Sequence, residues 1–193
     1  MRLTADGLVL AGGRSRRMGQ NKADLPYGSS TSLVQHARDV LEAAVSGMVW
    51  VSRPLTWNDP TENDIPDAVA AQGPLHGIWQ GLTRTHHEWL AVVAVDCPNV
   101  PPELYETLYR ARRATDRVLI PYYGAVAQPL AALWSKALTD AIAKDLQAEQ
   151  FKVQTLLDRV ATHYIKVRQP DWLVNLNTPG DWENWRQTTG GRP

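Results

Sequence analysis

Short apolar runs alternate along the chain with stretches in which apolar residues recur at helical spacing. The runs predict strands at residues 8–10, 48–51, 90–95, 118–121, 131–134 and 163–167. The amphipathic stretches predict helices over residues 32–45, 75–85, 102–113, 135–148, 153–161 and from 179 onward. Strands that alternate with helices predict an α/β fold, with a mostly parallel sheet covered by helices on both faces.

Several helix ends and one loop can be placed more closely. The segment Ser32-Leu-Val-Gln35 predicts a capping box, Pro101-Pro102 suits a first helical turn, and Thr178-Pro179 predicts the cap of the last helix. Residues 53–73 hold three prolines and are expected to be a loop. Trp182 and Trp185 are three apart and predict one packed helix face.

Composition narrows the function. The chain has 193 residues, with 20 Lys and Arg against 20 Asp and Glu, so its formal net charge is zero. We therefore expect no nucleic-acid partner. A single cysteine, Cys97, excludes an internal disulfide and fits a reducing compartment. No apolar run approaches membrane-spanning length and the first residues do not resemble a signal peptide, so a cytoplasmic protein without a membrane partner is expected.

The segment LAGGRSRRMGQNK, residues 10–22, directly follows the first predicted strand. Gly12 and Gly13 allow the backbone to approach an anion closely, and three arginines with Lys22 supply positive charge. The segment lacks the Gly-Lys-Ser/Thr end of a P-loop, and adjacent glycines break the dinucleotide-binding pattern. It therefore predicts a site for a polyphosphate.

Four segments carry a family resemblance. They are LAGGRSRRMGQNK, QGPLHGIWQGL (72–82), AVDCPNVPPEL (94–104) and LVNLNTPGDW (173–182). In order and spacing they are similar to the molybdenum cofactor guanylyltransferases, over almost the whole chain. The resemblance implies a single-domain Rossmann-like nucleotidyltransferase at residues 1–187, with a nucleotide half at about 1–100, a pterin-substrate half at about 101–187, and a frayed tail at 188–193.

The resemblance also implies a Mg²⁺-dependent enzyme that transfers GMP from GTP to the phosphate of molybdenum-bound molybdopterin and releases pyrophosphate. A molybdenum insertase and a client apoenzyme are candidate protein partners. The implied catalytic residues are Arg17, Lys22 and Asp96, and Asp96 is the implied metal ligand. The implied GTP contacts are Leu10, Ala11, Gly12, Gly13, Lys22, Asp67, Gly73, Gly77 and Asp96. The implied molybdopterin contacts are Gln128, Lys152, Asn175 and Asn177.

The residues themselves give chemical reasons for some of these roles. Asp96 follows the clearest buried strand and should stand at the carboxyl edge of the sheet, where a carboxylate can hold Mg²⁺ with few protein ligands. Gly73 and Gly77 would leave space for a purine. Asn175 and Asn177 are two apart in an extended segment, so their amides should face the same side. Each position also has a purely structural interpretation: a turn, a helix start, a strand end.

Other reactive side chains are not expected to take part. The five histidines have no zinc-site spacing with one another or with Cys97. His76 is expected on the solvent face of its helix, Lys152 taken alone is typical of a solvated surface lysine, and Cys97 is expected to pack rather than react.

Departures from the family leave three alternatives open. Asn21 replaces the usual Asp before Lys22, Val51-Ser52-Arg53 replaces a segment that often holds Asn, and Gly180-Asp181 replaces two acids. The alternatives are a cytidylyltransferase on the same pterin, a sugar-1-phosphate nucleotidyltransferase, and a non-catalytic nucleotide-binding relative. Gly12 favours guanine, and the closing Asn-x-Asn-Thr-Pro disfavours the sugar enzyme.

Overall fold

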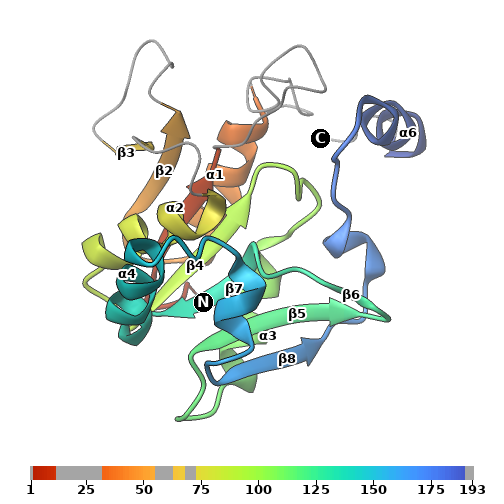
Figure 1. The fold of residues 1–193 in the computed structure, drawn as a ribbon. Coiled ribbons are helices and arrows are strands. Elements are labelled where there is room, and N and C mark those ends of the chain that lie inside the picture. Colours follow the sequence, from red (N-terminus) through yellow and green to blue (C-terminus); the bar gives the residue numbers. More distant parts are fainter. Residues whose placement is uncertain (1, 12–31, 55–62, 68–72, 190–193) are drawn as a thin grey trace.

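The computed structural model describes residues 2–11, 32–54, 63–67 and 73–189 (Figure 1). Its strands are β1 Asp6–Leu10, β2 Val49–Pro54, β3 Asp64–Asp67, β4 Trp89–Ala94, β5 Val118–Tyr123, β6 Val126–Ala127, β7 Ala131–Ser135 and β8 Thr162–Lys166. Its α-helices are α1 Leu33–Ala44, α2 Gly73–Arg84, α3 Pro102–Ala111, α4 Thr139–Gln147, α5 Val153–Leu157 and α6 Pro179–Thr189. Two 3₁₀ helices, η2 Lys136–Leu138 and η3 Pro170–Leu173, complete these elements.

The described strands form one eight-stranded sheet in the order β3-β2-β1-β4-β7-β5-β6, and β8 also pairs with β5. The pairs β1–β2, β1–β4, β2–β3 and β5–β8 are parallel, which confirms the predicted mostly parallel sheet. Strand β7 runs antiparallel to both of its neighbours, β4 and β5. Because two reversals cancel, β5 runs in the same direction as β4. The carboxyl ends of β1, β2, β4 and β5 therefore point toward one edge of the sheet, where open α/β folds bind their ligands.

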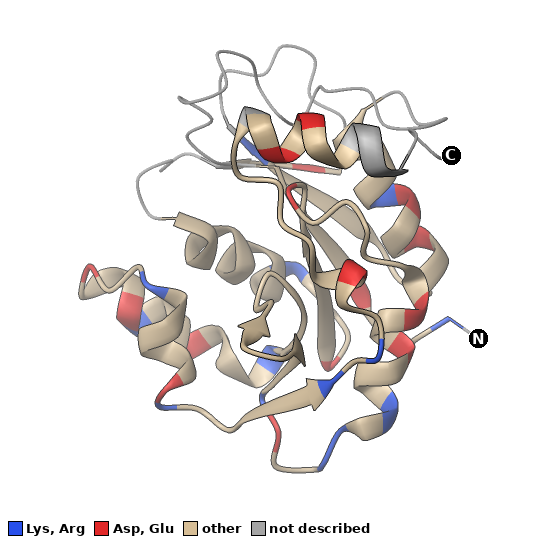
Figure 2. Ribbon diagram, turned by 90° about the vertical axis from the view of Figure 1, so that its right-hand side faces the viewer, with Lys and Arg blue, Asp and Glu red and all other residues tan. Residues whose placement is uncertain are grey.

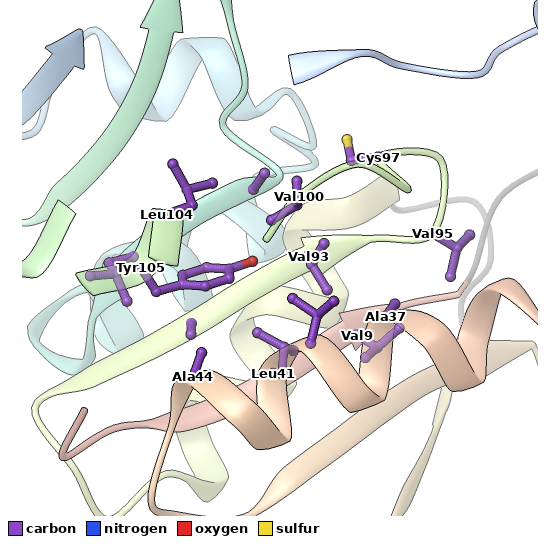
Figure 3. Close-up of a cluster of buried hydrophobic side chains, with 14 of the residues drawn as sticks. Val9, Ala37, Leu41, Ala44, Val93, Val95, Cys97, Val100, Leu104 and Tyr105 are labelled. Atoms are coloured by element: carbon purple, nitrogen blue, oxygen red, sulfur yellow. The ribbon is translucent and has the colours of Figure 1, made fainter. Parts of the chain in front are cut away.

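Helices cover both faces of the sheet, as predicted. Alternate residues of β1 belong to different cores: Val9 belongs to a cluster with residues of α1, α3 and α6, whereas Leu8 and Leu10 belong to a cluster with residues of α2, α4 and α5. Figure 3 shows part of the first core, in which Val9 and Val93 of the sheet face Leu41 of α1. In Figure 1, α2 and α4 lie together on the opposite face, in agreement with their direct packing.

One predicted loop contains strand structure. Residues 53–73 were expected to be irregular, but β2 continues to Pro54 and β3 pairs with it in parallel. Ile65 of β3 is buried, and Val51 donates a backbone hydrogen bond to the carbonyl of Asn63 at 3.1 Å. Strand β3 ends the sheet, and an edge strand tolerates a proline such as Pro66 because its outward side needs no N–H donor.

Other element ends differ by a few residues from the predictions. The predicted helix 135–148 begins with the 3₁₀ turn η2, and the predicted helix 153–161 ends at Leu157. Helix α6 continues to Thr189, beyond the predicted domain end at residue 187, while residues 190–193 lie outside the described residues.

Both predicted side-chain caps are present. Ser32 Oγ accepts a hydrogen bond from the amide of Gln35 at 3.1 Å, although the Gln35 side chain donates to Asp39 instead of returning to the cap. Thr178 Oγ1 accepts from the amide of Asp181 at 3.1 Å, and Asp181 Oδ2 accepts from the amide of Thr178 at 2.8 Å. The start of α6 is thus a complete, reciprocal capping box.

Charged residues of both signs are interspersed along the described ribbon (Figure 2). The described helices include none with the length and apolar character that crossing a membrane requires.

Candidate functional site

The glycine-rich loop leaves the sheet between the ends of two other strands. The amide of Ala11 donates to the carbonyl of Ser52 at 2.9 Å, and the amide of Val95 donates to the carbonyl of Leu10 at 3.2 Å. The predicted phosphate residues Gly12, Gly13, Arg17 and Lys22 lie outside the described residues, as does Asn21. Leu10 and Ala11, both buried, therefore fix where this loop begins: beside the ends of β2 and β4.

Asp96 lies in a pair of tight turns directly after β4, which we call the Asp96 turn (residues 96–100). The carbonyl of Ala94 accepts from the amide of Cys97 at 3.0 Å, and the carbonyl of Cys97 accepts from the amide of Val100 at 3.4 Å. Val95 and Cys97 are buried, while Asp96 between them is partly exposed. The prediction that Asp96 stands at the carboxyl edge of the sheet is confirmed.

Cys97 supports this turn and does not have the character of a nucleophile. Its Sγ lies 3.6 Å from Oδ1 of Asp96, so the thiol can donate to the carboxylate. Burial first, and then the neighbouring charge of Asp96, raise the pKa of the Cys97 thiol well above its ordinary value. Since a thiolate is the nucleophilic form, burial and a raised pKa both disfavour a nucleophilic role for Cys97, in agreement with the expectation that it packs.

Helix α1 also contacts the turn. Nε2 of His36 lies 2.9 Å from the carbonyl oxygen of Pro98. A carbonyl can only accept, so Nε2 of His36 carries the proton and donates it. Burial lowers the pKa of His36, although the hydrogen bond to Pro98 and the charge of Asp39 act in the opposite direction. A neutral His36 with its proton on Nε2 is sufficient for this contact.

Two of the predicted second-substrate residues, Asn175 and Asn177, flank a residue that contacts the Asp96 turn. The amide of Leu176, between Asn175 and Asn177, donates to the carbonyl of Asp96 at 2.8 Å. Oδ1 of Asn175 is shielded from solvent and has no hydrogen-bond partner within the described structure, whereas Asn177 is exposed. A contact of either asparagine with molybdopterin stays a prediction.

Gln128 has a structural role, because it connects two segments of the chain by hydrogen bonds. Its side chain is buried, and Nε2 donates to the carbonyl of Leu173 at 3.3 Å. Its backbone amide donates to the carbonyl of Pro121 at 3.0 Å. It thereby joins the end of β5 to the segment that precedes Asn175. A direct contact of Gln128 with molybdopterin stays a prediction.

The two glycines of the Gly-Pro-Leu-His-Gly element are required for different reasons. Gly73 has φ of 66°, a conformation that disfavours any side chain. At Gly77 a Cβ would lie 2.8 Å from Cδ2 of Leu10 and 3.0 Å from Oγ of Ser52. Leu10 and Ser52 thus fill the space beside Gly77 that was expected to accommodate a purine, and the glycine is explained by close packing of α2 on β1 and β2.

Lys152 and Asp67 are placed only in part. Lys152 is exposed at the start of α5, and the carbonyl of the preceding Phe151 lies 3.7 Å from the Cβ position of Gly73. The residue before Lys152 therefore lies beside the start of α2, in the predicted nucleotide half. Asp67 ends β3, and its side chain lies outside what the structure describes.

One prediction for α2 is wrong. His76 was expected to face solvent but is buried, with its ring centroid 5.8 Å from that of Trp79. Helix α2 packs on α4 as well as on the sheet, so less of its surface remains for solvent.

Sequence reasoning assigned no site role to His36, Asn99 or Trp185. Nε1 of Trp185 donates to Oδ1 of Asn99 at 3.0 Å, which ties α6 to the Asp96 turn. Asn99 lies inside one of the quoted motifs, but its partner is far away in the sequence. No local pattern reveals such a pair.

A sequence model described as the MobA-like NTP transferase domain matches residues 7–163, which is most of the chain. The chain belongs to the MobA-like NTP transferase family.

Curated relatives of this MobA-like protein match along nearly its whole length. It is 34% identical to "Probable molybdenum cofactor guanylyltransferase" of Pelotomaculum thermopropionicum, over 93% of this chain and 90% of the relative. It is 29% identical to "Molybdenum cofactor guanylyltransferase" of Syntrophotalea carbinolica, over 95% and 91% of the two chains.

Solved structures share the MobA-like fold at lower identity. The molybdopterin-guanine dinucleotide biosynthesis protein A of Archaeoglobus fulgidus superposes with a TM-score of 0.76 at 23% identity, over 96% of this chain and 98% of that one. The 2-C-methyl-D-erythritol 4-phosphate cytidylyltransferase of Thermus thermophilus gives 0.71 at 16% identity, over 97% and 100%. At these identities the likeness establishes the nucleotidyltransferase fold.

The described side chains of this MobA-like chain fit a Mg²⁺ ion held by one carboxylate better than a metal enclosed by several protein ligands. Among the residues that the structure describes, no three His, Cys, Asp or Glu side chains gather into a metal-binding cluster. A metal enclosed by protein ligands alone is therefore not supported there. Asp96, a partly exposed carboxylate at the carboxyl edge of the sheet, fits a Mg²⁺ ion that would keep waters and phosphate oxygens as its other ligands.

Proposed function

We propose that this nucleotidyltransferase transfers GMP from GTP to the phosphate of molybdenum-bound molybdopterin. The names of its curated relatives, at 29–34% identity over more than nine-tenths of the chain, support the reaction. One structural observation carries the proposal. The hydrogen bond from Leu176 to the carbonyl of Asp96 brings the Asn175–Asn177 segment to the edge where the glycine-rich loop begins.

In this reaction an oxygen of the molybdopterin phosphate attacks the α-phosphorus of GTP. A new P–O bond forms, the bond to the oxygen bridging the α- and β-phosphorus breaks, and pyrophosphate leaves with the electron pair of that bond. The attacking phosphate is already ionised at neutral pH, so no general base is required. This agrees with a site in which Cys97 is held as a thiol and His36 donates to a backbone carbonyl.

The protein then supplies position and charge. Arg17 and Lys22 would offset the negative charge of the triphosphate and of the departing pyrophosphate. Asp96 would hold Mg²⁺, which supplies further neutralisation of phosphate oxygens when bound. Asn175 and Asn177 would bind the polar groups of the pterin substrate.

The test is an assay with purified protein, Mg²⁺, molybdenum-loaded molybdopterin and each of the four nucleoside triphosphates in turn. Pyrophosphate release and chromatography of the dinucleotide product are measured together. We expect GTP to give the product and to bind more tightly than CTP, UTP or ATP in competition calorimetry. Equal turnover with CTP would refute the guanine assignment. Absence of product with all four triphosphates would refute transferase activity itself.

A further inference from the structure

The Asp96 turn receives hydrogen bonds from both ends of the chain. From α1, His36 donates to the carbonyl of Pro98. From the C-terminal segment, which we define as residues 173–185, Leu176 donates to the carbonyl of Asp96 and Trp185 donates to the side chain of Asn99. The C-terminal segment thus holds the turn at two separate points, one on each of its tight turns.

These two points are rigidly connected. The capping box of Thr178 and Asp181 fixes the start of α6 directly after Leu176, and the amide of Asn177 also donates to Asp181 Oδ2 at 2.9 Å. Farther along α6, Trp185 is buried and stacks on Trp182, with ring centroids 5.4 Å apart and planes at 26°. From this buried position the indole N–H of Trp185 donates to Oδ1 of Asn99 at 3.0 Å.

We propose that Asn99 and Trp185 are positioning residues for Asp96, through which the C-terminal segment sets the metal affinity of the nucleotide complex. The proposal rests on the proposed function in one respect, namely that Asp96 holds the metal ion. It follows that the Asp96 carboxylate is coupled to the segment that carries Asn175 and Asn177. Ordering of this segment would favour the carboxylate position that binds the metal, and metal binding would favour the ordered segment.

The physical reason lies in how the carboxylate is fixed. Asp96 is partly exposed, so packing alone does not fix its direction. Its neighbours do: Cys97 donates from Sγ to Oδ1, and the turn that contains Cys97 is closed by Val100. Without the bond from Trp185 to Asn99, the second turn loses an outside restraint. Mg²⁺ and ions like it demand a narrow ligand geometry, so a less restricted carboxylate binds them more weakly.

The test measures metal binding and not turnover. Mn²⁺ is the probe, and its binding to the protein–GTP complex is followed by electron paramagnetic resonance. Trp185→Phe keeps the aromatic ring but removes the N–H donor, and Asn99→Ala removes the acceptor. The matched control is Trp89→Phe, because the buried indole N–H of Trp89, at the amino end of β4, has no hydrogen-bond partner within the described residues.

We expect Trp185→Phe and Asn99→Ala each to weaken Mn²⁺ binding by about threefold to tenfold, the range that one lost hydrogen bond produces. Trp89→Phe, which removes an indole N–H that makes no hydrogen bond in the described structure, should stay within about twofold of the unmodified protein. Metal-free GTP binding should change little in all three variants. The double variant should be no weaker than the stronger single variant, since both changes remove the same bond.

Unchanged Mn²⁺ affinity in a folded Trp185→Phe protein would overturn the proposal, as would an equal loss in Trp89→Phe. Thermal unfolding establishes that each variant is folded, and if Trp185→Phe is not, Asn99→Ala decides. Failure of the proposed function is recognised separately. A protein that binds Mn²⁺ with GTP or CTP but transfers no guanylyl group, and whose Trp185→Phe variant binds Mn²⁺ more weakly, refutes the reaction and supports the positioning role.

Discussion

Thr85 donates a hydrogen bond from its hydroxyl to Oδ2 of Asp6, with 2.6 Å between the two oxygens, and both side chains are buried. Asp6 also accepts from the backbone amides of Met48 at 2.7 Å and His86 at 3.2 Å. The carboxylate therefore joins the start of β1 to the segments that lead into β2 and β4. It lies at the amino end of these parallel strands, opposite the edge that carries Asp96.

Thr85→Val should destabilise the fold without affecting nucleotide binding. The change keeps the shape of the side chain but removes a donor to a buried carboxylate and the acceptor for the amide of His87. The free energy of unfolding should fall by about 1.5–3 kcal/mol, measured by urea titration. Thr83→Val is the control, because the exposed Thr83 bonds only within α2 and should change stability by less than about 0.5 kcal/mol. Equal effects of the two changes would contradict the role of Asp6.

Asp96→Asn should abolish turnover while leaving the fold intact. The amide keeps the shape of the carboxylate at a partly exposed position but loses the charge that attracts a metal ion. The rate of pyrophosphate release should fall by about a thousandfold or more, with the unfolding midpoint nearly unchanged. Asp140→Asn, at an exposed position on α4, serves as the control. Near-normal turnover of Asp96→Asn at limiting Mg²⁺ would place the metal elsewhere.

The two substrates should depend on different ends of the chain. Lys22→Ala should weaken GTP binding by about 1.5–3 kcal/mol through loss of a charge-assisted contact. The double change Asn175→Ala with Asn177→Ala should leave GTP binding almost unaltered and weaken molybdopterin binding. Calorimetry with each ligand separately measures both effects. A GTP affinity that falls equally in both variants would mean that the asparagines belong to the nucleotide pocket or to the core.

His36 should make the fold less stable at acidic pH. Burial lowers its pKa below the ordinary value of 6.5, so the unfolded chain binds a proton more readily than the folded protein does. Stability should therefore be highest above pH 6.5 and fall as the pH drops below it toward the lowered pKa of the folded state. His36→Gln retains an N–H that can reach the carbonyl of Pro98 but cannot titrate. Its loss of unfolding free energy between about pH 7.5 and about pH 5.5 should be smaller than that of the unmodified protein, measured by urea titration.

Local chemistry made much of the fold predictable. Ser32 and Thr178 cap their helices as expected, because a cap depends on residues three positions away. The apolar run at 90–95 is a central strand, although its neighbour β7 is antiparallel and not parallel. Strand direction could not be predicted at β7 because a fully buried strand is equally apolar in either direction. Strand β3 escaped prediction because Pro66 and its polar neighbours have the composition of a loop.

The position of Asp96 at the carboxyl edge of the sheet was predictable, because the end of one strand determines it. Features that tertiary contacts decide were not predictable. Gly77 is a glycine because Leu10 and Ser52 approach it, and His76 is buried because α4 covers α2. The support of the Asp96 turn by His36 and Trp185 joins segments that no sequence spacing relates.

The support of the Asp96 turn by the C-terminal segment also has a consequence for the order in which the chain folds. A chain is synthesised from its amino end, and β1, β2 and β4 together with the Asp96 turn leave the ribosome well before the residues of α6 do. The amide of Leu176 and the indole of Trp185 reach the turn only when the C-terminal segment folds back onto it. A nascent chain could therefore assemble its central strands early and still lack a fixed carboxylate. On the proposed assignment, competence would arise late in folding, after both of the proposed substrate-binding regions exist.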